Sequence, residues 1–133
     1  MQWAALIAWI ATALGGFTLF AQWLRHGGLN QEEGIRAPRL FSHLATALVG
    51  LTLWVVYMLG DDKFFAWVAV ALLLAVALLG VSMLAISSRG RTTTERTAAP
   101  AEALFPLPVV IAHGALGTIT LILAVLAAAG IGS

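Results

Sequence analysis

The strongest constraint on the fold is that the apolar residues gather into four long blocks without any Asp, Glu, Lys or Arg. These blocks are Trp3–Leu24, Leu40–Leu59, Phe64–Ile86 and, roughly, Leu104–Ile131. A helix needs about 20 apolar residues to cross a bilayer, and each block reaches that length. With 61% hydrophobic and 10% charged residues among 133, the chain departs far from a soluble domain, in which about a quarter of residues are charged. The sequence therefore predicts a single integral membrane domain over residues 1–133.

The predicted fold class is all-α, an antiparallel bundle of four transmembrane helices over about 3–24, 38–59, 64–86 and 106–131. The first block lacks the basic flank and the cleavage site of a signal peptide, so we expect it to remain in the bilayer. The connections 25–39 and 87–103 carry six of the seven basic residues. The positive-inside rule places both connections in the cytoplasm and both termini outside the inner or plasma membrane. Four aromatic residues fall near block ends, where membrane interfaces hold aromatic belts: Trp3, Trp23, Tyr57 and Trp67.

The chain contains an internal repeat, which we place at about 1–60 and 64–131. An offset of 70 residues aligns the second block with the fourth and matches Pro38 with Pro108 and His43 with His113. An offset of 64 aligns the first block with the third and matches Trp3 with Trp67, Gly16 with Gly80 and Arg25 with Arg89. The pattern predicts a duplicated two-helix hairpin whose copies are related by an axis along the membrane normal.

The two repeat-related histidines are the candidate ligands. Proline is favoured in the first turn of a helix, so Pro38 and Pro108 would each place a histidine five residues into its helix, about 7–8 Å below the cytoplasmic end. If the second and fourth helices lie diagonally, His43 and His113 face each other across a gap of about 12–14 Å between helix axes. That gap suits one iron porphyrin with two axial imidazoles. Side-by-side helices would leave too little room, and the sequence does not decide between the two arrangements.

Small and polar residues near that depth extend the candidate site. A flat macrocycle needs notches between helices, for which we expect Gly16, Gly80, Gly114 and Gly117. The hydroxyls of Thr18 and Ser82 are candidates to orient the imidazoles. Arg39, with other arginines at the same end, is the candidate partner of the haem propionates. His26 is expected to be a solvated loop residue, and the connection 87–103 a flexible linker.

Other chemistry is less compatible with the sequence. No cysteine is present, so disulfides and thiolate metal sites are excluded. A zinc site would need three or four ligands, and proton-coupled transport usually relies on intramembrane carboxylates, which the blocks lack. No nucleic-acid patch or nucleophile–base pair is found. Two alternatives to haem stay open for the histidines: another ligand, such as a quinone or a metal ion, or a structural role between helices.

A four-helix membrane bundle with histidines on two helices, each five residues after a proline and followed by small residues, resembles the b-type cytochrome membrane subunits. These include cytochrome b561-like proteins and the haem-bearing anchors of respiratory dehydrogenases. The resemblance implies haem b as cofactor and His43 and His113 as axial ligands. It departs from the di-haem pattern, because the outer halves of the helices contain no histidine.

The predicted function is one-electron transfer by a single bis-histidine haem near the cytoplasmic face. The partner would be quinone or a protein within a larger redox complex or a homo-oligomer, and we expect an electron-transfer subunit rather than a complete enzyme. The rival prediction is a non-redox membrane carrier or scaffold subunit, whose histidines are structural or bind a substrate.

Overall fold

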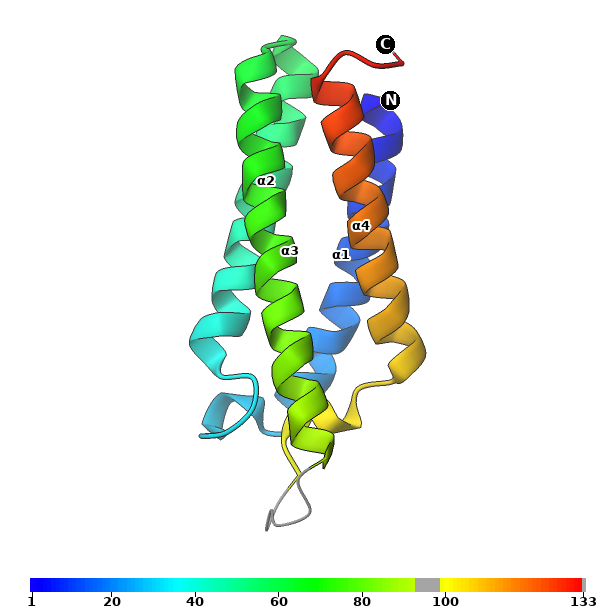
Figure 1. Ribbon diagram of the computed structural model, residues 1–133. Coiled ribbons are helices and arrows are strands. Elements are labelled where there is room, and N and C mark those ends of the chain that lie inside the picture. The colour runs from blue at the N-terminus through cyan, green and yellow to red at the C-terminus, as the bar shows by residue number, and fades with distance from the viewer. Residues whose placement is uncertain (93–98, 133) are drawn as a thin grey trace.

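The described residues fold into four long helices and two short 3-10 helices. In the computed structural model, which describes residues 1–92 and 99–132, the elements are α1 (Gln2–Arg25), η1 (Gly28–Asn30), α2 (Ala37–Gly60), α3 (Lys63–Thr92), η2 (Ala101–Leu104) and α4 (Leu107–Ala128). The long helices alternate in direction along a common axis (Figure 1), and the described residues form no strand. The predicted all-α architecture is confirmed. Each long helix has the length and apolar composition needed to cross a membrane.

The helix boundaries follow local chemistry. Pro38 and Pro108 lie in the first turns of α2 and α4, as predicted, where a missing N–H breaks no helical hydrogen bond. The turn from α2 to α3 places Asp61 in the left-handed region, with φ 53°. Asp62 then accepts a hydrogen bond from the Phe64 N–H at 2.9 Å and caps α3. At its other end α3 continues to Thr92, about six residues beyond the predicted boundary.

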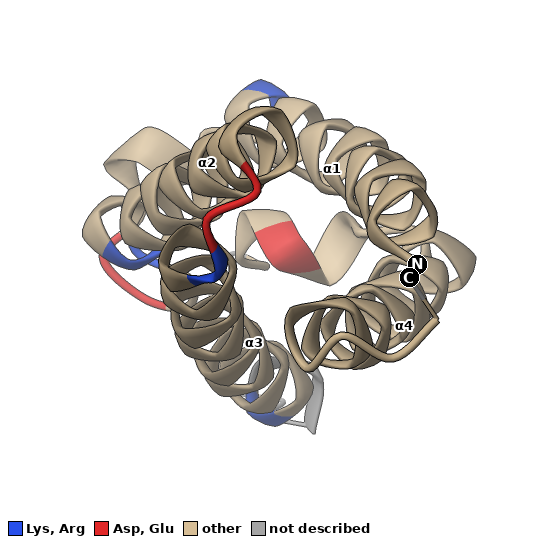
Figure 2. Cartoon of the chain, turned by 90° about the horizontal axis from the view of Figure 1, so that it is seen from above, with Lys and Arg blue, Asp and Glu red and all other residues tan. Residues whose placement is uncertain are grey.

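The helices pack as two close pairs. α1 packs along α4 and α2 along α3, whereas the contact of α3 with α4 is smaller and that of α1 with α2 smaller still. Seen along the axis, α2 and α4 therefore occupy diagonal corners of the bundle (Figure 2). This is the arrangement that the haem hypothesis requires.

The two ends of the bundle differ in what they carry. Both termini lie at one end (Figure 1), where the Met1 amine donates a hydrogen bond to the Gly132 carbonyl at 3.1 Å. We call this the terminal end; it also holds the turn Asp61–Asp62. The opposite end, which we call the connection end, holds the α1–α2 connection and the described part of the α3–α4 connection. Residues 93–98 of the predicted flexible linker lie outside the described part of the chain.

The apolar core fills the half of the bundle nearer the terminal end. Trp9 and Trp54 pack at its centre with ring centroids 6.3 Å apart. Trp9 lies against Gly50, where a Cβ would approach its ring to 3.1 Å. Two members of the predicted aromatic belt, Trp23 and Tyr57, are in fact buried between elements of the bundle, because their polar atoms and rings find partners there. The half nearer the connection end is less filled and holds the histidines.

The α3–α4 connection is more than a linker. Its 3-10 helix, η2, lies across the connection end and is visible between the four helices in the axial view of Figure 2. Ala101 and Glu102 are buried there. The prediction of a simple flexible segment is thus wrong for the described residues 99–103, because one carboxylate and one backbone N–H in it form hydrogen bonds with the α1–α2 connection.

Candidate histidine site

His43 on α2 and His113 on α4 face each other inside the bundle. Their ring centroids lie 6.3 Å apart, and the ring planes are inclined at 59°. Both side chains are half-buried. The sequence places the two residues 70 positions apart, and they meet because the α2 and α4 helices are diagonal and each histidine follows a first-turn proline by five residues.

The His113 ring is held in one orientation by α1. Its Nδ1 lies 2.9 Å from the carbonyl oxygen of Thr12. Because a carbonyl only accepts, Nδ1 carries the proton and donates it, and in the neutral ring Nε2 keeps a free lone pair. A backbone carbonyl that fixes the tautomer in this way is the usual outer partner of a metal-ligating histidine.

The His43 ring lies in the repeat-equivalent position but lacks the hydrogen bond that orients His113. Its Nδ1 is buried and has no hydrogen-bond partner among the described residues. The backbone of Val76 lies beside the ring, although outside hydrogen-bonding geometry. Val76 follows Thr12 by 64 residues, the offset of the repeat, so both imidazoles lie against the equivalent turn of the neighbouring helix.

Two glycines make room for the imidazoles. A Cβ on Gly16 of α1 would lie 3.0 Å from Cε1 of His113, and a Cβ on Gly80 of α3 would lie 3.5 Å from Cε1 of His43. Each histidine therefore packs on a glycine of the helix with which its own helix forms a close pair. The predicted depth of Gly16 and Gly80 matches that of the histidines. Their immediate neighbour is the imidazole ring itself.

Two adjoining cavities meet at the histidine pair. The upper cavity has a volume of about 260 Å³ and extends from the histidines toward the terminal end as far as Trp9 and Leu51. The lower cavity has a volume of about 360 Å³ and extends toward the connection end, where Ile35, Ser87 and Phe105 line it. Both linings are almost entirely apolar. The lower cavity alone falls within the range of about 300–1,000 Å³ typical of small-molecule sites.

The lining of the upper cavity follows the repeat. Every lining residue except Leu51 has its repeat equivalent in the same lining. Some pairs are identical, such as Ala13 with Ala77, and others differ in size, such as Leu44 with Gly114. The same repeat positions of α1 and α3, and of α2 and α4, therefore line the cavity. The side chains on α1 and α2 are mostly bulkier than those on α3 and α4.

The other predicted site residues lie at different distances from this centre. Gly114 and Gly117 line the upper cavity; a Cβ on Gly114 would meet open space, and one on Gly117 would meet the Thr12 methyl at 3.7 Å. Arg39 is exposed at the start of α2 and lines neither cavity. His26 is exposed, as predicted, and its Nδ1 lies 2.7 Å from the Gln22 carbonyl.

The predicted orienting hydroxyls do not contact the histidines. Thr18 donates to the Leu14 carbonyl and Ser82 to the Leu79 carbonyl, each within its own helix. The Thr12 carbonyl, which the sequence reasoning missed, orients His113 instead. A backbone acceptor has no residue-type signal, although Thr12 lies one helical turn before Gly16 on the same face.

The part of the chain that the structure describes has no group of three or more His, Cys, Asp or Glu side chains arranged to hold a metal ion. His43 and His113 line both cavities. In the comparisons with known proteins, no protein-family model, no curated protein and no solved structure matches the chain.

Proposed function

We propose that this protein is an integral membrane b-type cytochrome that holds one haem between His43 and His113. The observation that carries the proposal is the 6.3 Å separation of the two imidazole centroids across the bundle. Metal–imidazole bonds are about 2.0–2.1 Å long, so two rings on opposite sides of one ion have centroids a little over about 6 Å apart. The two apolar cavities that meet at the pair, the upper of which is lined by repeat-equivalent positions, would supply space for a flat ligand.

Membrane insertion is the first part of the proposal. The four long helices span 22 to 30 residues, and many large apolar side chains point outward, such as Leu14, Leu78 and Ile111 at more than 60% exposure. The connections that carry six of the seven basic residues meet at one end of the bundle, which supports a cytoplasmic connection end and external termini. The bilayer is then the partner that covers the outer surface.

Gene duplication is the second part. The close pairs α1–α4 and α2–α3 exchange with each other under the repeat, because α1 corresponds to α3 and α2 to α4. The contacts Gly16–His113 and Gly80–His43 exchange in the same way. This supports a two-hairpin origin with a pseudo-twofold axis passing between the imidazoles.

The residues present fit a haem in a specific way. His43 and His113 would be the axial ligands, with His113 oriented by the Thr12 carbonyl, while Gly16 and Gly80 keep the flanking helices clear of the rings and Gly114 and Gly117 line the space above. Haem b, when bound, supplies reversible one-electron chemistry at its iron. Among the described residues, no Lys or Arg lines either cavity, so the propionates would have to extend to the connection end, where Arg39 lies.

The chain's own contribution would be to exclude water and to fix the ligands, which together set the reduction potential. A single haem near the connection end places electron exchange at the cytoplasmic face. Quinone, a larger redox complex or a second copy of the chain would be the partner. Resemblance to cytochrome b561-like subunits agrees with this role.

The test is an absorption spectrum of the purified chain, expressed with haem available. Dithionite reduction should give split α and β bands, and these bands should be lost in His43→Ala and in His113→Ala. His26→Ala is the matched control, because this exposed histidine lies at the same end of the bundle and should leave the bands unchanged. A colourless wild-type protein would overturn the proposal and favour the non-redox carrier or scaffold.

A further inference from the structure

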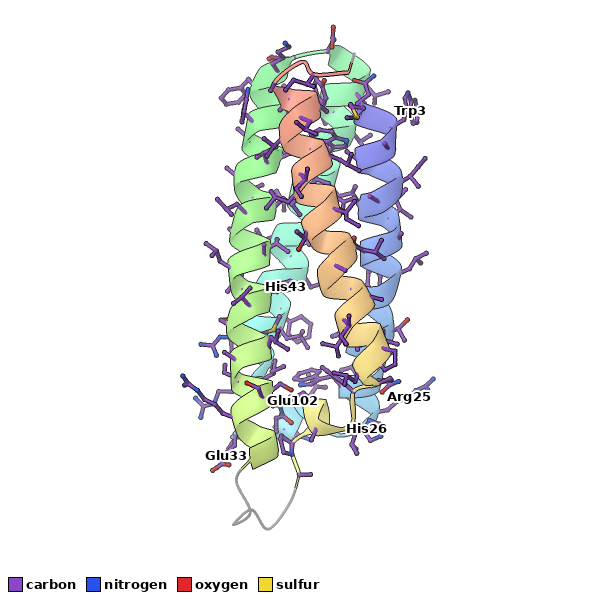
Figure 3. All side chains as sticks on the ribbon, turned by 45° about the vertical axis from the view of Figure 1, so that its right-hand side comes forward. Trp3, Arg25, His26, Glu33, His43 and Glu102 are labelled. Carbon is purple, nitrogen blue, oxygen red and sulfur yellow. The ribbon has the colours of Figure 1, made fainter. Side chains whose placement is uncertain are left out.

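The 3-10 helix η2 lies at the connection end of the bundle and is followed directly by Phe105, a residue that lines the lower cavity. Figure 3 labels Glu102 at the connection end, with His43 nearer the middle of the bundle. Pro100 and Phe105 flank η2 as its N-cap and C-cap residues. Ile35, on the α1–α2 connection, lines the same cavity and is 4% exposed. Residues from both connections, α1–α2 and α3–α4, therefore line the connection end of the lower cavity.

One buried carboxylate holds them. Glu102 is 1% exposed; its Oε1 accepts a hydrogen bond from the Ile35 N–H at 2.8 Å, and its Oε2 accepts one from Nε2 of Gln31 at 2.9 Å. Gln31 returns the interaction, because its Oε1 accepts from the Ala101 N–H at 3.0 Å. Three hydrogen bonds thus join η2 to the α1–α2 connection.

The α1–α2 connection is shaped to receive this carboxylate. Gly34 has φ 79°, and a Cβ at this position would collide with Oε1 of Glu102. The Ile35 carbonyl accepts hydrogen bonds from Nε1 of Trp23 at 3.1 Å and from Nε2 of Gln31 at 2.8 Å. The site of Glu102 is thus built by backbone and side-chain groups from the end of α1 through Ile35.

A contact held by a hydrogen-bonded carboxylate favours a reversible closure over a permanent one. Its hydrogen-bond partners are neutral amides, and burying an ion costs free energy that neutral hydrogen bonds offset only in part. Apolar side chains in place of Glu102 would favour the closed state more strongly, because they would lose free energy on exposure to water. A carboxylate instead gains hydration when the contact opens, which narrows the free-energy difference between closed and open states.

We propose that η2 is a gate, latched by Glu102, through which the lower cavity exchanges its contents with the aqueous phase at the connection end. The gate itself does not depend on haem. Only the identity of the ligand that passes through it rests on the proposed function.

The experiment uses the absence of cysteine from the chain. Ser87 is 8% exposed and lines the lower cavity, so Ser87→Cys in the full-length chain, purified in detergent, provides one thiol behind the gate. The rate of its modification by a charged, water-soluble thiosulfonate should be slow. Adding Glu102→Gln or Glu102→Ala should raise that rate at least about tenfold, because an amide at this position turns a donor toward a donor.

Two controls separate gating from unfolding. Glu32→Gln removes an exposed carboxylate of the same connection and should leave the rate at Ser87→Cys unchanged. Thr120→Cys, at a fully buried position on α4 outside the lower cavity, should stay protected with or without Glu102→Gln. Equal rates at Ser87→Cys with and without Glu102 would overturn the gate, as would parallel acceleration at both cysteines. A haem-free wild type would overturn the proposed function while leaving this assay intact.

Discussion

At the scale of single residues, the two histidines are related by the repeat but held differently. His113 donates to the Thr12 carbonyl, whereas the buried Nδ1 of His43 has no partner among the described residues. The glycines behind them differ as well, since the Cβ-to-ring distances would be 3.0 Å at Gly16 and 3.5 Å at Gly80. The two repeat-related glycines thus leave different amounts of space beside the imidazole rings.

That difference predicts unequal effects of alanine. At Gly16 the added methyl group would press on a His113 ring that its hydrogen bond prevents from moving away, so Gly16→Ala should cost about 1–3 kcal/mol of stability. Gly80→Ala makes an ordinary contact, and Gly114→Ala enters open space. Both should be neutral or stabilise by up to about 1 kcal/mol through helix propensity. Unfolding of the three variants in mixed micelles measures this; a Gly16→Ala variant as stable as Gly80→Ala would contradict it.

At the scale of elements, the α1–α2 connection holds two glycines with nearly the same backbone conformation and different surroundings. Gly27 has φ 78° and a Cβ there would meet nothing within 4 Å, whereas Gly34 has φ 79° and adjoins Glu102. Comparing alanine substitutions at Gly27 and Gly34 therefore separates two contributions to the free energy of unfolding: that of the left-handed backbone and that of displacing the Glu102 carboxylate.

Alanine at these two positions should therefore have graded effects. Gly27→Ala should lose about 1–2 kcal/mol, the cost of placing a Cβ in the left-handed region. Gly34→Ala should lose at least about 1 kcal/mol more, because the buried carboxylate must leave a hydrogen-bonded position. Thermal unfolding followed by circular dichroism compares them. Equal losses would mean that Glu102 adjusts without leaving its partners.

The sequence predicts the periodic elements of the fold better than it predicts the connections between them. The long helices, the first-turn prolines and the equal depth of His43 and His113 follow from composition, spacing and the repeat. That the two histidines meet depends also on the diagonal placement of α2 and α4, which the sequence left open. The burial of Glu102 does not follow from the sequence, because a lone carboxylate in a polar connection has the same local pattern whether it is solvated or paired. The burial of Trp23 does not follow from the sequence either, because its neighbours in space, including the Ile35 carbonyl, are set by the path of a connection and not by a periodic pattern.

At the scale of the whole molecule, the placement of both basic connections at one end predicts a fixed orientation in the membrane. Single cysteines at Glu32 and Asp61 lie at opposite ends of the bundle. In sealed vesicles of known orientation, a membrane-impermeant thiol reagent should label Glu32→Cys only from the cytoplasmic side and Asp61→Cys only from the other side. Labelling of both from one side would exclude the proposed topology.

The pairing of α1 with α4 and of α2 with α3 has a consequence for the continuity of the chain. The closest packing joins the first half of the sequence to the second, while the two helices within the first half share only a small contact. Each half alone is therefore a loosely packed helix pair with one imidazole, and its main packing partner is the other half of the chain. Cutting the turn at Asp61–Asp62 should yield two fragments that assemble when produced together, and neither fragment alone should retain a bundle or a complete pair of ligands.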